Sequence, residues 1–199
     1  MVREGASSTN SVSMSFRRLC VYCGSKKGTR PSYAHAAEEL GKVLVDRGWS
    51  LVYGGGSIGL MGVLANTVLD KGGEVIGVIT QELFDHEVGH SQLTKLHIVD
   101  SMHERKQLMF DLVDGFVVMP GGYGTLDEFF EIVTWQQLGI HAHPVGLLNV
   151  DRYFDPLLKF LDHARDEEFI STENRQLVVD ADTPAGLIPR MLEAKKRKT

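Results

Sequence analysis

Short apolar runs alternate with longer amphipathic runs along most of the chain, and this alternation limits the possible folds more than any single motif does. The run 115–119 holds no polar side chain, which is typical of a strand buried on both faces of a sheet. In 31–46 the apolar residues instead recur at helical spacing, as at Ala37, Leu40 and Leu44. Repeated strand–helix units predict a parallel sheet with helices on both faces. We therefore expect one α/β domain with a doubly wound, mostly parallel, Rossmann-like sheet.

The same patterns predict the individual elements. Strands are expected at 17–24, 50–53, 74–79, 95–99, 115–119, 144–149 and 176–179. Helices are expected at 31–46, 60–70, 102–112, 153–166 and 184–195, with one more running to about 138 after a glycine-rich turn at 120–125. The segment 80–94 is polar and too long for a tight connection, so we predict an irregular lid or binding loop there.

The 199 residues suffice for one domain with a sizeable core, which we place at 16–195. Residues 1–15 are rich in Ser, Thr and Asn and are predicted to be a disordered leader, and 196–199 a frayed basic tail. The leader lacks the apolar stretch of a signal peptide. No segment approaches the roughly 20 apolar residues that a membrane-spanning helix needs. The sequence thus predicts a cytoplasmic protein with no membrane partner.

Composition also limits the partners and the redox chemistry. The formal net charge of -5 argues against a nucleic-acid-binding surface. The only cysteines, Cys20 and Cys23, lie in a predicted strand, where residues three apart point to opposite faces. A zinc site would need a second pair of ligands, and none is evident in the sequence. We expect buried structural thiols and no metal.

The most informative motif follows strand 115–119 and reads Pro120-Gly121-Gly122-Tyr123-Gly124-Thr125-Leu126-Asp127-Glu128. A glycine-rich turn between a strand and a helix lets backbone N–H groups approach an anion closely, and the helix N-terminus adds partial positive charge. Glu128 falls near the first helical turn, beside whatever the loop binds. A phosphate site with a carboxylate next to it predicts chemistry on a phosphorylated ligand rather than binding alone.

A second glycine-rich loop, 54–59, satisfies the pattern G-x-G-x-x-G. A dinucleotide-binding fingerprint normally follows the first strand, whereas this loop follows the second, and the nearest acid after the next strand is Glu82. Leu60 and Met61 replace the Lys and Ser/Thr of a P-loop, which argues against an NTPase. Two interpretations stay open: a tight turn with close helix–sheet packing, or a loop that lines a nucleotide site.

The helix at 102–112 begins with His103-Glu104-Arg105-Lys106. Cations at a helix N-terminus oppose the macrodipole unless an anion is nearby. Arg105 and Lys106 are therefore candidates to meet the phosphate and the carboxylate of the site, and a solvated run of charges is the alternative.

Ligands of doubly wound sheets bind beyond the carboxyl ends of the strands. The loops that follow the predicted strands all fall on that edge. Their convergence is stronger evidence for a binding site than any single motif. Our candidate substrate-binding residues there are Ser25, Gly55, Gly56, Glu82, Met102, Lys106, Gly121, Gly122, Tyr123, Gly124 and Thr125.

From about residue 17 to 192 the chain resembles the LONELY GUY (LOG) family of cytokinin-activating phosphoribohydrolases. The segment 120–128 fits the family motif PGGxGTxxE, and Met102–Lys106 fits its companion, which ends in Arg-Lys. The resemblance implies hydrolysis of the N-glycosidic bond of a purine nucleoside 5'-monophosphate, releasing adenine or an N6-substituted adenine and ribose 5-phosphate. By motif position, Arg105 and Glu128 would be the catalytic pair, and the backbone of 121–125 with the Thr125 hydroxyl would hold the phosphate.

The resemblance further implies a homodimer or a higher homo-oligomer, with no metal and no organic cofactor. It does not name the proton donor to the leaving base, for which Glu82 and Glu87 of the predicted lid are candidates. The alternative is a non-catalytic nucleotide-binding or carrier protein on the same fold. A lysine decarboxylase would need a lysine bound to pyridoxal phosphate, and the setting of Lys106 is better explained by anion binding.

Overall fold

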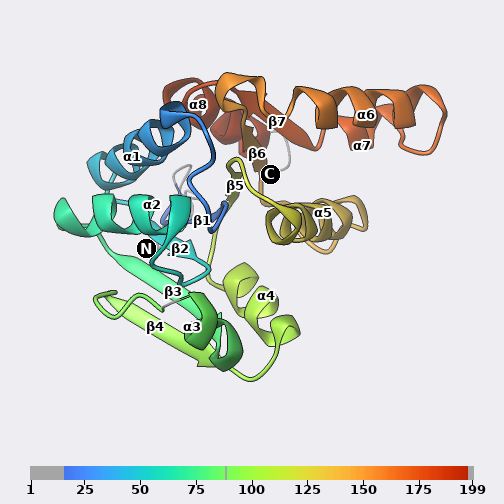
Figure 1. Cartoon of the computed structure of the whole chain (residues 1–199). Coiled ribbons are helices and arrows are strands. Elements are labelled where there is room, and N and C mark those ends of the chain that lie inside the picture. Colours follow the sequence, from blue (N-terminus) through green and yellow to red (C-terminus); the bar gives the residue numbers. More distant parts are fainter. Residues whose placement is uncertain (1–15, 88, 197–199) are drawn as a thin grey trace, which may run out of the picture.

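The computed structural model describes residues 16–87 and 89–196, so the predicted leader and the last three residues of the predicted tail lie outside it. A parallel sheet of seven strands runs through the protein in the order β4-β3-β2-β1-β5-β6-β7 (Figure 1). The strands are β1 (Arg18–Tyr22), β2 (Ser50–Tyr53), β3 (Val75–Thr80), β4 (Lys95–Val99), β5 (Phe116–Val118), β6 (Val145–Leu148) and β7 (Val178–Ala181).

Helices connect consecutive strands. They are α1 (Pro31–Asp46), α2 (Gly59–Asp70), α3 (Gln81–Glu87), α4 (Met102–Asp111), α5 (Tyr123–Gln137), α6 (Asp155–Asp166), α7 (Thr172–Arg175) and α8 (Pro184–Lys196), with a short 3-10 turn, η1 (Val150–Arg152). The predicted doubly wound α/β fold is confirmed, and all strand pairs of this sheet are parallel.

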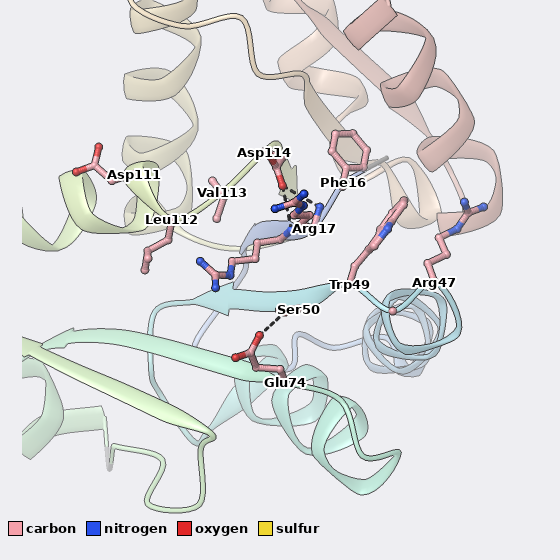
Figure 2. Close-up of a pocket in the computed structure, with 12 residues that line it drawn as sticks. Phe16, Arg17, Arg47, Trp49, Ser50, Glu74, Asp111, Leu112, Val113 and Asp114 are labelled. Atoms are coloured by element: carbon pink, nitrogen blue, oxygen red, sulfur yellow. Dashed lines mark hydrogen bonds between the residues drawn. The ribbon is translucent and has the colours of Figure 1, made fainter. Parts of the chain in front are cut away.

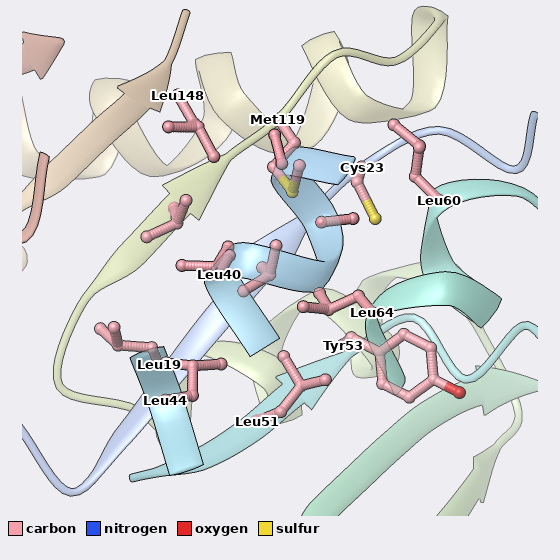
Figure 3. Packing of buried hydrophobic residues seen from close by; sticks show 14 of the residues in the cluster. Leu19, Cys23, Leu40, Leu44, Leu51, Tyr53, Leu60, Leu64, Met119 and Leu148 are labelled. Atoms are coloured by element: carbon pink, nitrogen blue, oxygen red, sulfur yellow. The ribbon is translucent and has the colours of Figure 1, made fainter. Parts of the chain in front are cut away.

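The sheet separates two apolar layers, because successive side chains of a strand point to opposite faces. Leu19 and Val21 of β1 pack with α1, α2 and α8, whereas Cys20 and Tyr22 of β1 pack with α4, α5 and α6. Figure 3 shows part of the first layer, in which α1 places leucines against the strands. Both cysteines are buried, as predicted, and neither forms a disulfide.

The predicted irregular segment 80–94 is wrong in its first half, which forms helix α3 directly after β3. Thr80 Oγ1 accepts a hydrogen bond from Leu83 N, and the Gln81 side chain donates to Asp85 one turn later. These local bonds stabilise a short helix. It was not predicted because its polar composition lacks the apolar periodicity of a helix. The largest other shifts of a boundary are two residues: β1 ends at Tyr22 rather than 24, α6 begins at Asp155 rather than 153, and β7 spans Val178–Ala181 rather than 176–179. The short helix α7 was not predicted.

The order of the strands determines where along the edge of the sheet a ligand can bind. β1 and β5 are neighbours at the centre of the sheet, β1 leads into α1 on one face, and β5 leads into α5 on the other. Their outgoing loops diverge, and a crevice opens at the carboxyl ends of these two strands, which is where doubly wound proteins bind their ligands.

A larger cleft of about 650 Å³ lies at the opposite, amino edge of the sheet (Figure 2). Its lining includes Arg17, Arg18 and Arg47, and Arg47 is the C-cap of α1. α4 also ends at this cleft, with Asp111 as its last residue and Leu112 as its C-cap. A cation complements the partial negative charge of a helix C-terminus, which explains Arg47 without a ligand.

Candidate active site

A cleft of about 290 Å³ opens where the loops after β1 and β5 diverge. It is bounded by the β1–α1 loop, by the starts of α2 and α4, by α3 and by the first two turns of α5. Its lining consists of Cys23, Gly24, Ser25, Met61, Leu83, Met102, Arg105, Gly122, Tyr123, Gly124, Thr125, Asp127 and Glu128.

The N-terminus of α5 forms one wall of this cleft. Gly122 is the N-cap and has an extended backbone, and no side chain caps the helix. The N–H groups of the first turn therefore lack intrahelical acceptors and face a site that can supply an anion. A Cβ at Gly121 would collide with the Thr125 hydroxyl, so glycine is required where the β5–α5 loop (residues 119–122) passes over Thr125.

A buried ion pair lies at the floor of the cleft. Arg105 Nη1 of α4 donates to Glu128 Oε1 of α5 at 2.8 Å, and Arg105 Nε donates to the Val78 carbonyl of β3 at 3.0 Å. Both charged side chains are buried. A Cβ at Gly54 would collide with Arg105 Nη2, so the second glycine-rich loop leaves room for the guanidinium.

Burial raises the pKa of Glu128 above its ordinary value, and the Arg105 guanidinium counteracts part of that rise. Cys20 and Tyr22 lie on the same face of β1, and burial raises the pKa of both groups. They remain neutral near pH 7, so Arg105 is the main charge that Glu128 meets. The weakly screening surroundings strengthen the attraction within the pair.

Polar and charged side chains at the start of α4 have partners within the protein. Ser101 is the N-cap and accepts from Glu104 N at 3.2 Å, while the Glu104 carboxylate accepts from Asp100 N at 3.1 Å. Lys106 Nζ lies 3.1 Å from both Asp127 and Glu131 of α5. Lys106 therefore joins α4 to α5, and its ammonium contacts carboxylates rather than lining the cleft.

Eight of the thirteen site residues predicted from the sequence line this cleft: Ser25, Met102, Arg105, Gly122, Tyr123, Gly124, Thr125 and Glu128. Five do not. Gly55 packs against Ile79 with a φ of +79°, Gly56 pairs with Gly89, Glu82 is exposed on α3, Lys106 joins two helices, and Gly121 lines a neighbouring cleft. The side chain of Glu87, a predicted proton-donor candidate, lies outside the described part of the chain.

Several residues that line the cleft were not predicted from the sequence. Cys23 and Gly24 follow β1, Met61 is the third residue of α2, and Leu83 belongs to the unpredicted helix α3. Gly54 was visible as the first glycine of the G-x-G-x-x-G pattern, but its contact with Arg105 had no signal in the sequence. Leu83 was hidden because its helix was predicted as a loop.

A second cleft of about 300 Å³ adjoins the first and shares Gly24, Ser25 and Gly122 with it. Its other lining residues are Lys26, Lys27, Gly28, Tyr33, Leu60, Pro120, Gly121 and Tyr153. The β5–α5 loop therefore separates two adjoining spaces at the carboxyl edge of the sheet.

Known proteins match this chain over most of its length. The model of a family described as "Possible lysine decarboxylase" matches residues 61–191. The cytokinin riboside 5'-monophosphate phosphoribohydrolase LOG of Oryza sativa subsp. japonica is 52% identical over 178 residues, which cover 89% of this chain and 74% of the relative. The chain belongs to the LOG family.

A second relative, the cytokinin riboside 5'-monophosphate phosphoribohydrolase LOG3 of Arabidopsis thaliana, is 49% identical over 178 residues, which cover 89% of this LOG-family chain and 83% of the relative. Solved structures of greater divergence share the fold. The Moco carrier protein of Chlamydomonas reinhardtii has a TM-score of 0.66 at 21% identity, over 92% of this chain and 98% of its own. The molybdenum cofactor binding protein of Rippkaea orientalis has a TM-score of 0.64 at 23% identity, over 92% and 97%.

The described residues of this LOG-family protein do not suit the decarboxylase label. Pyridoxal phosphate enzymes hold their cofactor on a lysine, and no lysine is among the described residues that line the cleft around Arg105 and Glu128. In the same part of the chain, no group of three or more His, Cys, Asp or Glu residues is arranged to hold a metal ion. None of the described helices has the length and apolar character to cross a membrane.

Proposed function

We propose that this protein hydrolyses the N-glycosidic bond of an N6-substituted adenosine 5'-monophosphate, or of AMP itself, to the free base and ribose 5-phosphate. The observation that carries the proposal is the position of Glu128, which Arg105 holds in the second helical turn of α5, close to its uncapped N-terminus. The names of relatives at 49–52% identity support the same reaction.

The 5'-phosphate is assigned to the N-terminus of α5. Free N–H groups of the first turn and the helix dipole stabilise an anion there, and the Thr125 hydroxyl offers a further donor. Thr125 and Glu128 are three residues apart and therefore share a face of the helix. One helical turn rises about 5.4 Å, comparable to the span of a ribose, so a phosphate at the first turn brings the anomeric carbon near Glu128.

Glu128 then supplies the chemistry. Cleavage of a glycosidic bond passes through an oxocarbenium-like state, whose positive charge a buried carboxylate stabilises. The same carboxylate orients the water that attacks the anomeric carbon and accepts its proton. The C–N bond breaks, its electron pair goes to the base, and the base takes up a proton. Arg105 keeps Glu128 ionised and fixed in one orientation, because the bond at 2.8 Å stabilises the charged form.

The base is assigned to the apolar side of the cleft. Met61, Leu83 and Met102 line the cleft from three different helices. Such a wall suits an adenine ring and an apolar N6 substituent. Glu82 precedes Leu83 on α3 and remains our candidate proton donor to the leaving base.

Chromatography of reaction products tests the proposal. Purified protein is incubated with AMP and with the 5'-monophosphates of isopentenyladenosine and zeatin riboside, and the free bases are quantified. We expect release of base and ribose 5-phosphate in equal amounts, and the ranking of the three substrates identifies the N6 preference. Folded protein that binds these nucleotides but releases no base would instead favour the non-catalytic carrier alternative.

We also propose a homodimer, or a higher homo-oligomer built from it, in a cytoplasmic setting. The exposed face of α5 and the residues after it carry Tyr123, Phe130, Leu138 and Ile140, and Tyr123 also lines the cleft. Exposed apolar patches of this kind favour a protein partner, and a second copy is the simplest one. Light scattering of the wild type and of Leu138→Glu tests this, with a shift of the variant to monomer as the expected result. Two buried cysteines that form no disulfide are consistent with a reducing compartment.

A further inference from the structure

A residue outside every sequence motif contacts the β5–α5 loop from the neighbouring cleft. The Tyr153 hydroxyl donates a hydrogen bond to the Gly121 carbonyl at 2.6 Å. We infer that Tyr153 is a positioning residue that fixes the orientation of the Gly121–Gly122 peptide for binding of the substrate phosphate. The inference rests on the proposed function, because it assigns a role to Tyr153 in the same phosphate site.

The geometry of the peptide bond explains how one hydroxyl can act in this way. A peptide unit is planar and trans, so the carbonyl of Gly121 and the N–H of Gly122 point in opposite directions. Tyr153 and Gly121 line the neighbouring cleft, whereas Gly122 also lines the candidate active site. A carbonyl held toward Tyr153 therefore leaves the Gly122 N–H directed away from Tyr153. If the peptide rotated, the loop would present a carbonyl dipole to the phosphate and repel it.

Glycines make this rotation easy, which is why an external contact is needed. Gly121 and Gly122 adjoin each other, and neither has a Cβ that would restrict its backbone. Gly122 is the N-cap of α5, yet no side chain of the helix holds it. The bond from Tyr153 supplies the missing restraint.

The turn that presents Tyr153 is held in an unusual conformation. Asp151 and Arg152 both carry side chains and have positive φ values of 50° and 61°. Residues with a Cβ rarely adopt this region, and such strain persists where surrounding contacts determine the conformation and where function depends on it.

The contacts around this turn come from Asn149, which follows β6, and from the starts of α6 and α1. Asn149 donates through Nδ2 to Asp155 at 2.9 Å, and its Oδ1 accepts from Phe154 N at 2.7 Å. The Asp151 carboxylate accepts from the Ser32 hydroxyl at the start of α1. The ring of Tyr153 meets the Tyr33 ring edge-on, with 5.9 Å between centroids. The start of α1 thus stabilises the turn at 150–152, and Tyr153 after this turn stabilises the β5–α5 loop.

Titration calorimetry tests the inference separately from turnover. The parent is the Glu128→Gln protein, so that bound AMP is not consumed. Adding Tyr153→Phe removes only the hydroxyl, and we expect the affinities for AMP and for ribose 5-phosphate to fall together by about five- to tenfold, the effect of one lost hydrogen bond. Tyr33→Phe is the matched control. It removes a hydroxyl from the same cleft, and no described hydrogen bond joins that hydroxyl to the β5–α5 loop.

Steady-state kinetics of the otherwise wild-type enzyme provide a second readout. Tyr153→Phe is expected to raise KM by a similar factor and to change kcat less than about twofold, whereas a merely structural role would lower the active fraction and leave KM unchanged. If Tyr153→Phe does not fold, Ser32→Ala loosens the same turn and is expected to weaken AMP binding about twofold.

The outcomes separate the two proposals. Unchanged AMP affinity in Tyr153→Phe, or in Ser32→Ala where the first variant does not fold, overturns the positioning role alone. Absence of AMP binding to folded parent protein overturns the proposed function and this inference together.

Discussion

Arg105 Nη1 and Glu128 Oε1 lie 2.8 Å apart although the two residues are on different helices and both side chains are buried. A buried ion pair adds little net stability, because removing two charges from water offsets most of their attraction. The pair also leaves Glu128 beside a cleft rather than within the core. Its position is therefore better explained by a requirement for a fixed carboxylate at the site than by folding.

Glu128→Gln should lower the rate of base release by at least about 100-fold, because the amide can neither accept a proton nor stabilise positive charge as a carboxylate does. AMP binding should change less than about threefold, since the phosphate site on α5 is untouched. Product chromatography and calorimetry measure the two quantities. Glu131→Gln is the matched control, because Glu131 lies one turn later on α5, bonds Lys106 and does not line the cleft. Retained turnover in Glu128→Gln would remove Glu128 from its assigned role.

Gly54→Ala should displace the Arg105 guanidinium, because the new Cβ would lie only 2.4 Å from Nη2. The guanidinium is the end of a flexible side chain, so the fold should survive while Glu128 loses its partner. We expect kcat/KM to fall about 10- to 100-fold and the melting temperature to change by only a few degrees. Gly186→Ala on α8 is the control, since its Cβ would come no closer than 3.3 Å to Ala181 and Thr183, a contact that a small shift relieves. Wild-type activity in Gly54→Ala would show that the guanidinium need not be fixed.

The pH profile of kcat/KM should have an acidic limb above the ordinary glutamate pKa of about 4.3, because burial raises the pKa of Glu128 and the reaction needs its ionised form. In Gly54→Ala the limb should move to still higher pH, because the displaced Arg105 no longer favours the charged carboxylate. Rates measured from pH 4 to 8 at saturating and limiting substrate separate this effect from binding. A limb that stays in place in the variant would argue that Arg105 does not influence Glu128.

The fold was predictable because each strand–helix unit has a clear pattern of its own. β5 is entirely apolar, and α1 repeats its apolar residues at helical spacing, so tertiary contacts had no local preference to overcome. Helix α3 was missed because it depends on a capping bond from Thr80 and a single side-chain pair, which a polar composition does not reveal. The strained turn at 151–152 was missed because neither residue is glycine.

The candidate site, too, was predictable only in part. Arg105 and Glu128 were predicted from motifs, and the order of the strands brings them together. Lys106 was predicted beside the phosphate, but adjacent residues of a helix point in different directions, so its ammonium reaches Asp127 and Glu131. Tyr153 had no signal, because its role depends on a contact with a loop 32 residues away along the chain.

The free energy of unfolding should decrease as the pH falls from about 7.5 to 5.5, in part because of His90. Its Nε2 lies 2.9 Å from Asn66 Oδ1 and its Nδ1 accepts from Gln92 N, so the neutral ring satisfies both contacts. Burial lowers the pKa of His90, so the unfolded chain binds a proton more readily than the folded protein below about pH 6.5. His97 and His143 shift in the same direction and add to the effect.

Denaturant titrations at the two pH values check this expectation. His90→Gln should lower stability at pH 7.5 and reduce the difference between the two pH values. Asn66→Ala is the control, because it removes the partner of Nε2 but keeps the titrating ring, and it should leave most of the pH dependence in place. An unchanged pH dependence in His90→Gln would assign the effect to the other two histidines.

Glu168→Gly should stabilise the protein by about 0.5–1 kcal/mol, equivalent to roughly 1–4 °C in melting temperature for a chain of this size. Glu168 has a φ of 65° at the position just after α6, where Phe169 N bonds the Ala164 carbonyl and Glu168 N bonds the Arg165 carbonyl, both at 2.9 Å. This helix ending normally takes glycine, because a Cβ is unfavourable at positive φ. Glu167→Gly removes the same charge one residue earlier, at a φ of -84°, and should instead destabilise. Thermal denaturation of both variants therefore separates backbone strain from charge, and equal shifts in the two would assign the effect to charge.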